Sequence, residues 1–291
     1  MSHLKKRLKT DILLLDGAMG SQLISRGLKP GEALEYWVIE NPEDIARIHA
    51  QYFEAGADIV ITNTFGATAP KLSHYKLSDR VSEINARAAE VARRVCPPDK
   101  FVAGDIGPTG LMLKPYGAAE EAEVFAAFEE QAGALADGGV DLFIVETMMD
   151  LREALLALKA TKSHNLPTLA CMTFDKKPRG YFTMMGNNSK DVVIALAEAG
   201  ADAVGANCSL RIKDMIGLVS EIRAATSLPI VAEPNAGSPE LEDGKPKYID
   251  GPEAIGEMIP ELIAAGARII GGCCGTGPDT IREIRRTIDR L

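Results

Sequence analysis

The sequence predicts a (β/α)8 barrel, because short apolar runs alternate with longer amphipathic segments along the whole chain. Eight such runs are rich in β-branched or small residues, and each is followed by a turn signal, as buried parallel strands are. Four helical segments are each closed by a glycine directly before a run, where a helix C-terminus favours glycine. Eight strand–helix units in 291 residues are typical of this barrel. A doubly wound open sheet is the alternative.

The eight apolar runs are the expected strands. They comprise residues 12–16, 58–63, 101–105, 141–146, 168–174, 203–208, 230–233 and 268–272. Helices are expected between them, including residues 42–55, 120–137, 190–199 and 252–265. Pro42, Pro252 and Pro278 have the position of first-turn prolines. Residues 107–119 and 237–251 are the longest irregular stretches, and we expect them to form the rim of an active site.

A weak internal repeat supports the number of strands. The letters AGAD at 55–58 and 199–202, GGVD at 138–141 and AGAR at 265–268 each stand directly before an expected strand. They precede the second, sixth, fourth and eighth runs. Neither a low-complexity segment nor a linker divides the chain, so we expect one barrel domain over residues 1–291.

Composition disfavours several classes of partner. Hydrophobic residues make up 46% of the chain and charged residues 25%, as in soluble globular proteins. A net charge of −9 argues against binding to nucleic acid or to an anionic membrane. The sequence contains neither a membrane-spanning apolar run nor a secretory signal. We therefore expect a cytoplasmic protein in which the five cysteines remain reduced.

The most informative motif is GGCCGT at residues 271–276, which follows the last apolar run. Adjacent cysteines form a disulfide only with strain, but a glycine turn allows both thiols to reach one metal ion. Cys208 ends the sixth run, and strand ends meet at one mouth of such a barrel. Cys208, Cys273 and Cys274 can therefore converge on Zn²⁺. Three thiolates leave a fourth tetrahedral position open, which is typical of a catalytic zinc site.

Blander interpretations of the cysteines exist. A free cysteine is often a small buried hydrophobic residue, and we expect that role for Cys171, whereas Cys96 ends a helix. The glycine turn could instead cradle a phosphate at the start of the following helix. That hypothesis leaves the cysteine pair unexplained.

Polar residues also stand at the ends of the other expected strands. They are Asp16, Asn63, Thr64, Asp105, Glu146, Thr147, Thr173, Asn207, Glu233 and Asn235. Asp16 could equally form an Asx turn, and Glu146 could favour the N-terminus of the next helix. None of the four histidines stands at a strand end, so we expect no histidine ligand.

In these motifs, and over roughly residues 10–290, the chain resembles the homocysteine S-methyltransferase family. DGAMG at 16–20 resembles the family's N-terminal motif. NTFGA at 63–67, GDIGPTG at 104–110 and MTFD at 172–175 resemble the homocysteine module of cobalamin-dependent methionine synthase. GANCS at 205–209 and GGCCGT at 271–276 resemble the two zinc motifs.

The resemblance implies a barrel in which Cys208, Cys273 and Cys274 hold the zinc of the catalytic site. It implies that the homocysteine thiol binds this zinc. The amino-acid end of homocysteine would then be held by residues near the first, fourth and seventh strands. These are Asp16, Glu146 and Asn235, with Thr64 nearby and the backbone amides of Ala18 and Met19 as donors to the carboxylate.

The reaction implied is transfer of a methyl group to the zinc-bound thiolate of homocysteine, which forms methionine. The expected donor is a methylcobalamin-like corrinoid carried by a separate protein. One alternative is a methyltransferase that uses S-methylmethionine, S-adenosylmethionine or a betaine. Another is a non-catalytic subunit that binds thiols or a corrinoid partner.

Overall fold

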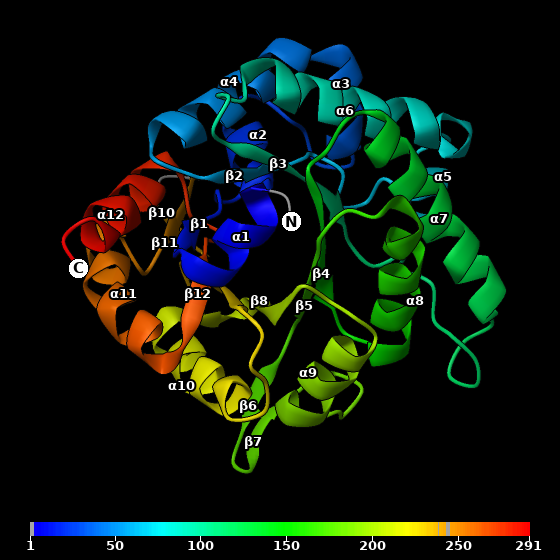
Figure 1. Ribbon diagram of the computed structural model, residues 1–291. Helices are drawn as coiled ribbons and strands as arrows, with labels where there is room; N and C mark the ends of the chain where they lie inside the picture. The colour runs from blue at the N-terminus through cyan, green and yellow to red at the C-terminus, as the bar shows by residue number, and fades with distance from the viewer. Residues whose placement is uncertain (1–2, 238, 243–244) are drawn as a thin grey trace.

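The computed structural model describes residues 3–237, 239–242 and 245–291 and contains a parallel eight-stranded barrel ringed by helices (Figure 1). In spatial order the strands are β1 (Leu13–Leu14), β12 (Ala267–Ile270), β9 (Ile230–Asn235), β8 (Ala203–Arg211), β5 (Thr168–Met172), β4 (Leu142–Met148), β3 (Phe101–Ile106) and β2 (Ile59–Ile61). A parallel bridge between Leu15 and Ile59 joins the two outermost strands and closes the barrel. All eight predicted strands are confirmed.

One principal helix follows each strand and packs on the outside of the barrel (Figure 1). These helices are α4 (Pro42–Glu54), α6 (Val81–Val95), α7 (Glu121–Asp137), α8 (Leu151–Thr161), α9 (Ser189–Glu198), α10 (Ile212–Arg223), α11 (Pro252–Ala265) and α12 (Pro278–Ile288). The predicted first-turn prolines begin α4, α11 and α12. Shorter helices are α1 (His3–Thr10), α2 (Met19–Ser25), α3 (Trp37–Glu40) and α5 (Ala69–Ser73), and 3-10 turns cover Leu34–Tyr36, Ser78–Arg80 and Lys162–His164.

Two buried clusters hold the barrel together, one between strands and helices and one inside the barrel. The inner cluster takes alternate residues from the strands, as the period of two in a strand dictates. On β4 it takes Leu142 and Ile144, so that Glu146 is next in line at the carboxyl end. Cys171 belongs to this inner cluster, which confirms its predicted core role.

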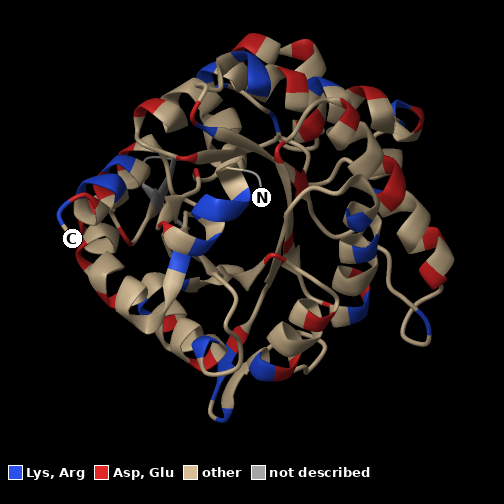
Figure 2. Cartoon of the chain, in the orientation of Figure 1, with Lys and Arg blue, Asp and Glu red and all other residues tan. Residues whose placement is uncertain are grey.

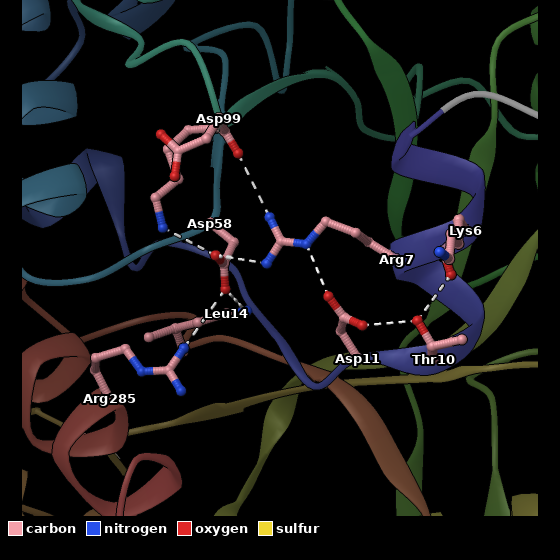
Figure 3. Close-up of polar contacts among 9 residues, drawn as sticks. Lys6, Arg7, Thr10, Asp11, Leu14, Asp58, Asp99 and Arg285 are labelled. Atoms are coloured by element: carbon pink, nitrogen blue, oxygen red, sulfur yellow. Dashed lines mark hydrogen bonds and ion pairs between the residues drawn. The ribbon is translucent and has the colours of Figure 1, made fainter.

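The amino-terminal end of the barrel is covered by α1, which lies across its centre in Figure 1 and carries basic residues (Figure 2). Leu4 and Leu8 of α1 join the inner cluster. Asp58 lies beside it and accepts hydrogen bonds from Arg7 at 3.1 Å, Lys100 at 2.9 Å and the Leu14 amide at 3.0 Å (Figure 3).

The charge of Asp58 is therefore neutralised. Arg285 adds a further ion pair at 3.6 Å. Burial alone raises the pKa of Asp58, but the Lys100 and Leu14 hydrogen bonds and the cations outweigh it and hold this pKa below 3.8.

The rim expectation needs one correction. Residues 237–251 are not irregular, because β10 (Pro239–Glu242) and β11 (Lys245–Tyr248) pair as an antiparallel hairpin; Ser238, Asp243 and Gly244 lie outside the described residues. A second hairpin, β6 (Asp175–Lys177) with β7 (Gly180–Phe182), follows β5 and was not predicted. Within the described ranges, no helix is long and apolar enough to span a membrane.

Candidate functional site

Three cysteine sulfurs meet at the carboxyl end of the barrel. The Sγ atoms of Cys208, Cys273 and Cys274 all lie within 4.8 Å of one another, with 4.0 Å between Cys208 and Cys274. Cys208 comes from β8, and the other two follow β12. A tetrahedral zinc ion with Zn–S bonds of about 2.3 Å separates its sulfurs by about 3.8 Å. The cluster therefore fits such an ion with little movement.

Irregular backbone aims Cys208 at the cluster. The register of β8 against β9 shifts between Asn207 and Arg211. Cys208 and Ser209 have φ angles of 60° and 56°, a left-handed conformation that residues other than glycine rarely adopt. Bulges of this kind re-aim side chains beside active sites.

The segment that carries Cys273 and Cys274 is shaped by a glycine and by contacts with β9. A Cβ atom on Gly275, whose φ is 86°, would lie 2.3 Å from the ring of Tyr248. The Cys273 amide donates to the Pro234 carbonyl at 3.0 Å. The side chain of Asn235 links this segment to Cys208. Its Nδ2 donates to Cys208 Sγ at 3.6 Å, and its Oδ1 accepts from the Cys274 amide at 3.1 Å. Asn235 thus lies at the cysteine cluster.

The three thiols interact strongly even without a metal. Hydrogen bonds from Cys273 and Cys274 hold the pKa of Cys208 well below its usual value. The same bonds to Cys208 raise the pKa of Cys273, and also raise the pKa of Cys274 to about 11. One thiolate is thus shared by three sulfurs. A divalent cation would be needed to make all three thiolates favourable together.

Four acidic side chains gather at the same end of the barrel. They are Asp16 after β1, Asp105 on β3, Glu146 on β4 and Glu233 on β9. Asp16, Asp105 and Glu233 are no more than 4% exposed, and each has a carboxylate oxygen without a hydrogen-bond partner among the described residues. Burial raises the pKa of all four, and repulsion from neighbouring acids or from Cys208 adds to it.

Glu146 is the acid with the most defined surroundings. Its Oε2 accepts a 2.6 Å hydrogen bond from Asn207, whose Oδ1 in turn accepts from the Thr147 amide at 2.8 Å. Thr147 has a φ angle of 55°, at the point where β4 shifts register against β5. Burial raises the pKa of Glu146, the Asp105 carboxyl group lowers it and the charge of Cys208 raises it, so that the resulting pKa is about 7.

The other predicted substrate contacts lie at the same end of the barrel, and some of their polar groups already have hydrogen-bond partners. Asp16 accepts a hydrogen bond from the Ile61 amide at 3.0 Å through one oxygen. The Ala18 amide donates to the Thr276 carbonyl at 3.0 Å. Met19 begins α2, where amides have no intrahelical acceptor. Thr64 is fully buried and donates to the Asp105 carbonyl at 2.8 Å.

Sequence reasoning singled out no role for Asn207, Asp105 or Glu233, although all three stand at strand ends. Asn207 links the bulge of β4 to that of β8. Asp105 and Glu233 point into the barrel with unpartnered oxygens. The sequence feature that marks all three is a polar residue at a strand position whose alternation places it among the apolar residues inside the barrel.

Comparison with known proteins gives a consistent result. The family model described as homocysteine S-methyltransferase matches residues 13–288. The methionine synthases of Mycobacterium leprae and Mycobacterium tuberculosis are each 31% identical to the chain, over 99% and 96% of it. The chain spans 25% of the length of each of these relatives.

A solved structure agrees over the full barrel. The metallated form of the homocysteine methyltransferase MmuM from Escherichia coli has a TM-score of 0.79 and 27% identity, over 96% of both chains. The oxidized form of the same protein has a TM-score of 0.80 and covers 97% of this chain and 99% of that one.

Proposed function

The chain belongs to the homocysteine S-methyltransferase family, and from this premise we propose that it methylates the thiol of homocysteine to form methionine. The observation that carries the proposal is the convergence of three cysteine sulfurs within 4.8 Å beside four acids, three of which are buried. The sulfurs suit a soft metal ion. The acids suit the ammonium group of an amino acid.

Zinc is the metal that this donor set fits best, and Cys208, Cys273 and Cys274 would hold it. When bound, Zn²⁺ would favour the thiolate form of the substrate sulfur, whose free pKa of about 8.5 leaves it mostly protonated at neutral pH. Asn235 would orient the cluster through its bonds to Cys208 and to the Cys274 amide.

The amino-acid end of homocysteine would be bound by groups on β1, α2 and β4. Asp16 and Glu146 would pair with the ammonium, which supplies the positive charge that the buried carboxylate of Asp16 and the half-buried one of Glu146 need. The Met19 amide would donate to the substrate carboxylate, whereas the Ala18 amide would first have to release Thr276. Thr64 would support Asp105. Fixing both ends of the substrate aims its sulfur, which lowers the entropic part of the barrier.

The donor we propose is a methyl-corrinoid carried by a separate protein. The motifs at 63–67, 104–110 and 172–175 support it, because they resemble the module of cobalamin-dependent methionine synthase. S-methylmethionine, S-adenosylmethionine and betaine are the alternative donors, and a non-catalytic subunit is the alternative role.

The test is a methyl-transfer assay on zinc-loaded protein with L-homocysteine and, in turn, methylcobalamin, S-methylmethionine, S-adenosylmethionine and betaine. We expect methionine, detected by mass spectrometry, with methylcobalamin. Methionine from one of the other donors alone would overturn the proposed donor but keep the acceptor. Failure with every donor, together with failure to bind homocysteine, would contradict the proposed function.

A further inference from the structure

Asn207 lies where the predicted ammonium site adjoins the cysteine cluster. It is a fully buried residue of β8 and directly precedes Cys208. Its side-chain amide makes three hydrogen bonds, all of them to β4. The Nδ2 atom donates to Glu146 Oε2 at 2.6 Å and to Thr147 Oγ1 at 2.7 Å, and the Oδ1 atom accepts from the Thr147 amide at 2.8 Å.

These three bonds fix the direction in which the amide faces. An asparagine side chain has two N–H donors and one carbonyl oxygen, and all of these groups are in use in Asn207. A flipped amide would place its oxygen against the Glu146 carboxylate and its N–H groups against the N–H of Thr147. Both contacts would be repulsive, so the hydrogen-bond network selects the orientation in which Glu146 receives an N–H donor.

The backbone is strained on both of the strands that Asn207 joins. Thr147, Cys208 and Ser209 have φ angles of 55°, 60° and 56°, which residues other than glycine rarely adopt. Three of the five non-glycine residues with a positive φ in the described ranges are thus bonded to Asn207 or follow it directly. Such conformations persist only where the surrounding structure holds them, and they gather at functional sites.

Both strands also lose their regular register at this residue. The register of β4 against β5 shifts where Glu146 and Thr147 lie, and that of β8 against β9 shifts directly after Asn207. The Asn207 carbonyl accepts a hydrogen bond from Thr173 Oγ1 at 3.2 Å, which ties the same residue to the end of β5. Displacement of Asn207 would therefore move Glu146 and Cys208 together.

We propose that Asn207 is a positioning residue that aims two groups at once. Its amide holds the Glu146 carboxylate toward the substrate ammonium, and its bonds to β4 fix the bulge from which Cys208 reaches the metal. This inference rests on the proposed function. The covalent structure of homocysteine sets the distance between its ammonium and its sulfur, so a single amide that places both anchors keeps their spacing matched to this ligand.

The experiment compares Asn207→Ala and Asn207→Asp with the native protein. Calorimetric titration of zinc-loaded protein at neutral pH measures the dissociation constants of L-homocysteine and of 4-mercaptobutanoate, which has the same thiol and carboxylate but lacks the ammonium. Competition with a chelator measures the zinc affinity. Asn85→Ala is the matched control, because Asn85 on α6 is also fully buried and its Nδ2 donates to two backbone carbonyls at 2.8 Å.

The two Asn207 variants should separate the two roles. Asn207→Asp keeps the oxygen that accepts from the Thr147 amide but cannot donate to Glu146. It should retain zinc and lose homocysteine affinity roughly tenfold, the loss typical of a hydrogen bond to a charged group, while its affinity for 4-mercaptobutanoate changes less than about threefold. Asn207→Ala lacks all three bonds, so it should lose the same preference for homocysteine and also bind zinc roughly tenfold more weakly.

Asn85→Ala should lower the thermal unfolding midpoint but keep the native zinc affinity and the native preference for homocysteine. Equal losses in this control would overturn the inference, because they would show that any buried asparagine has the same effect. A native preference for homocysteine in both Asn207 variants, or an equal loss of both thiol ligands in Asn207→Asp, would overturn the role toward Glu146.

Native zinc affinity in Asn207→Ala would overturn the role toward Cys208. If the native protein itself does not prefer homocysteine to 4-mercaptobutanoate, the proposed ammonium site fails and the role toward Glu146 fails with it. The zinc affinities would still decide whether Asn207 fixes the bulge that carries Cys208.

Discussion

The two ends of the barrel treat buried acids in opposite ways. At the amino-terminal end Asp58 is surrounded by Arg7, Lys100 and Arg285 (Figure 3), and these partners hold its pKa below 3.8. At the carboxyl end, Asp16, Asp105, Glu146 and Glu233 face one another and the cysteine cluster, and their pKa values are raised. The same chemical group is thus stabilised in its charged form at one end, whereas burial and repulsion oppose its charged form at the other.

This difference separates stability from function within one fold. At the amino-terminal end, Asp58 already has its counter-ions, and its ion pair with Arg7 holds α1 over the barrel. At the carboxyl end, Asp16, Asp105 and Glu233 each have an unpartnered oxygen, so a ligand must supply the positive charge that these acids lack. Such a site reduces stability and favours ligand binding.

The largest predicted effect is the loss of zinc and of methyl transfer at the carboxyl end of the barrel. Cys273→Ser removes one of three thiolates, and zinc content should fall from about one per chain to a trace. Loss of even an outer-shell partner lowers metal affinity or activity 10–100-fold, so methyl transfer should fall by more than about 100-fold. Atomic absorption and the methionine assay measure both. Cys96→Ser is the control, since Cys96 caps α6 and should retain zinc; a zinc-replete Cys273→Ser variant would break the account.

Glu146→Gln should separate binding from stability. Homocysteine affinity should fall by about 30-fold or more with the lost charge–ammonium pair. In the native protein the folded pKa of about 7 exceeds the ordinary 4.5, so ionisation of Glu146 destabilises the fold as pH rises from 4.5 through 7. The metal-free variant should therefore be more stable by about 3 kcal/mol at pH 8 and unchanged near pH 4. Urea unfolding at both pH values tests this, and a less stable variant at pH 8 would count against it.

Replacement of the buried acid at the amino-terminal end should instead lower the free energy of unfolding. Asp58→Asn removes the acid shared by three cations, of which Arg7 and Arg285 keep Asp11 and Asp289. We expect a loss of about 2–3 kcal/mol, below the usual range for a broken buried pair, because the cations are 20–24% exposed. The pKa of Asp58 is depressed, so its contribution is present above pH 3.8 and disappears as pH falls through the folded pKa. Urea unfolding at pH 7 and pH 3 measures it, while zinc content should not change. Equal stability at pH 7 would show that the cations do not need Asp58.

The smallest effect tests how the counter-charge is shared. Arg7→Gln leaves Lys100 and Arg285 beside Asp58, so the loss should be only about 0.5–1 kcal/mol and should shrink in 1 M salt. Unfolding midpoints at low and high salt measure it. A loss as large as that of Asp58→Asn would mean that Arg7 alone neutralises the acid.

The sequence predicts most of the architecture because burial enforces a regular pattern. The eight strands, the first-turn prolines and Gly56, Gly139, Gly200 and Gly266, whose φ angles range from 87° to 122°, follow from local chemistry. The hairpins β6–β7 and β10–β11 escape prediction because their short strands carry no hydrophobic alternation.

The candidate site is predictable only in part. The glycine turn identifies Cys273 and Cys274 as candidate metal ligands, and the barrel topology predicts that Cys208 lies beside them, as it does. The left-handed backbone of Cys208 and Thr147 cannot be anticipated, because non-glycine residues rarely adopt it. The involvement of Asn207 and Asp105 likewise depends on which polar atoms remain unpartnered after folding, and this is a property of the packed barrel.

The most direct test of the central claim is X-ray absorption at the zinc edge, on protein purified without chelator, before and after addition of homocysteine. The account predicts about one zinc per chain, coordinated by three sulfurs that become four when homocysteine binds. Absence of zinc, or a sulfur count that homocysteine does not change, would contradict it.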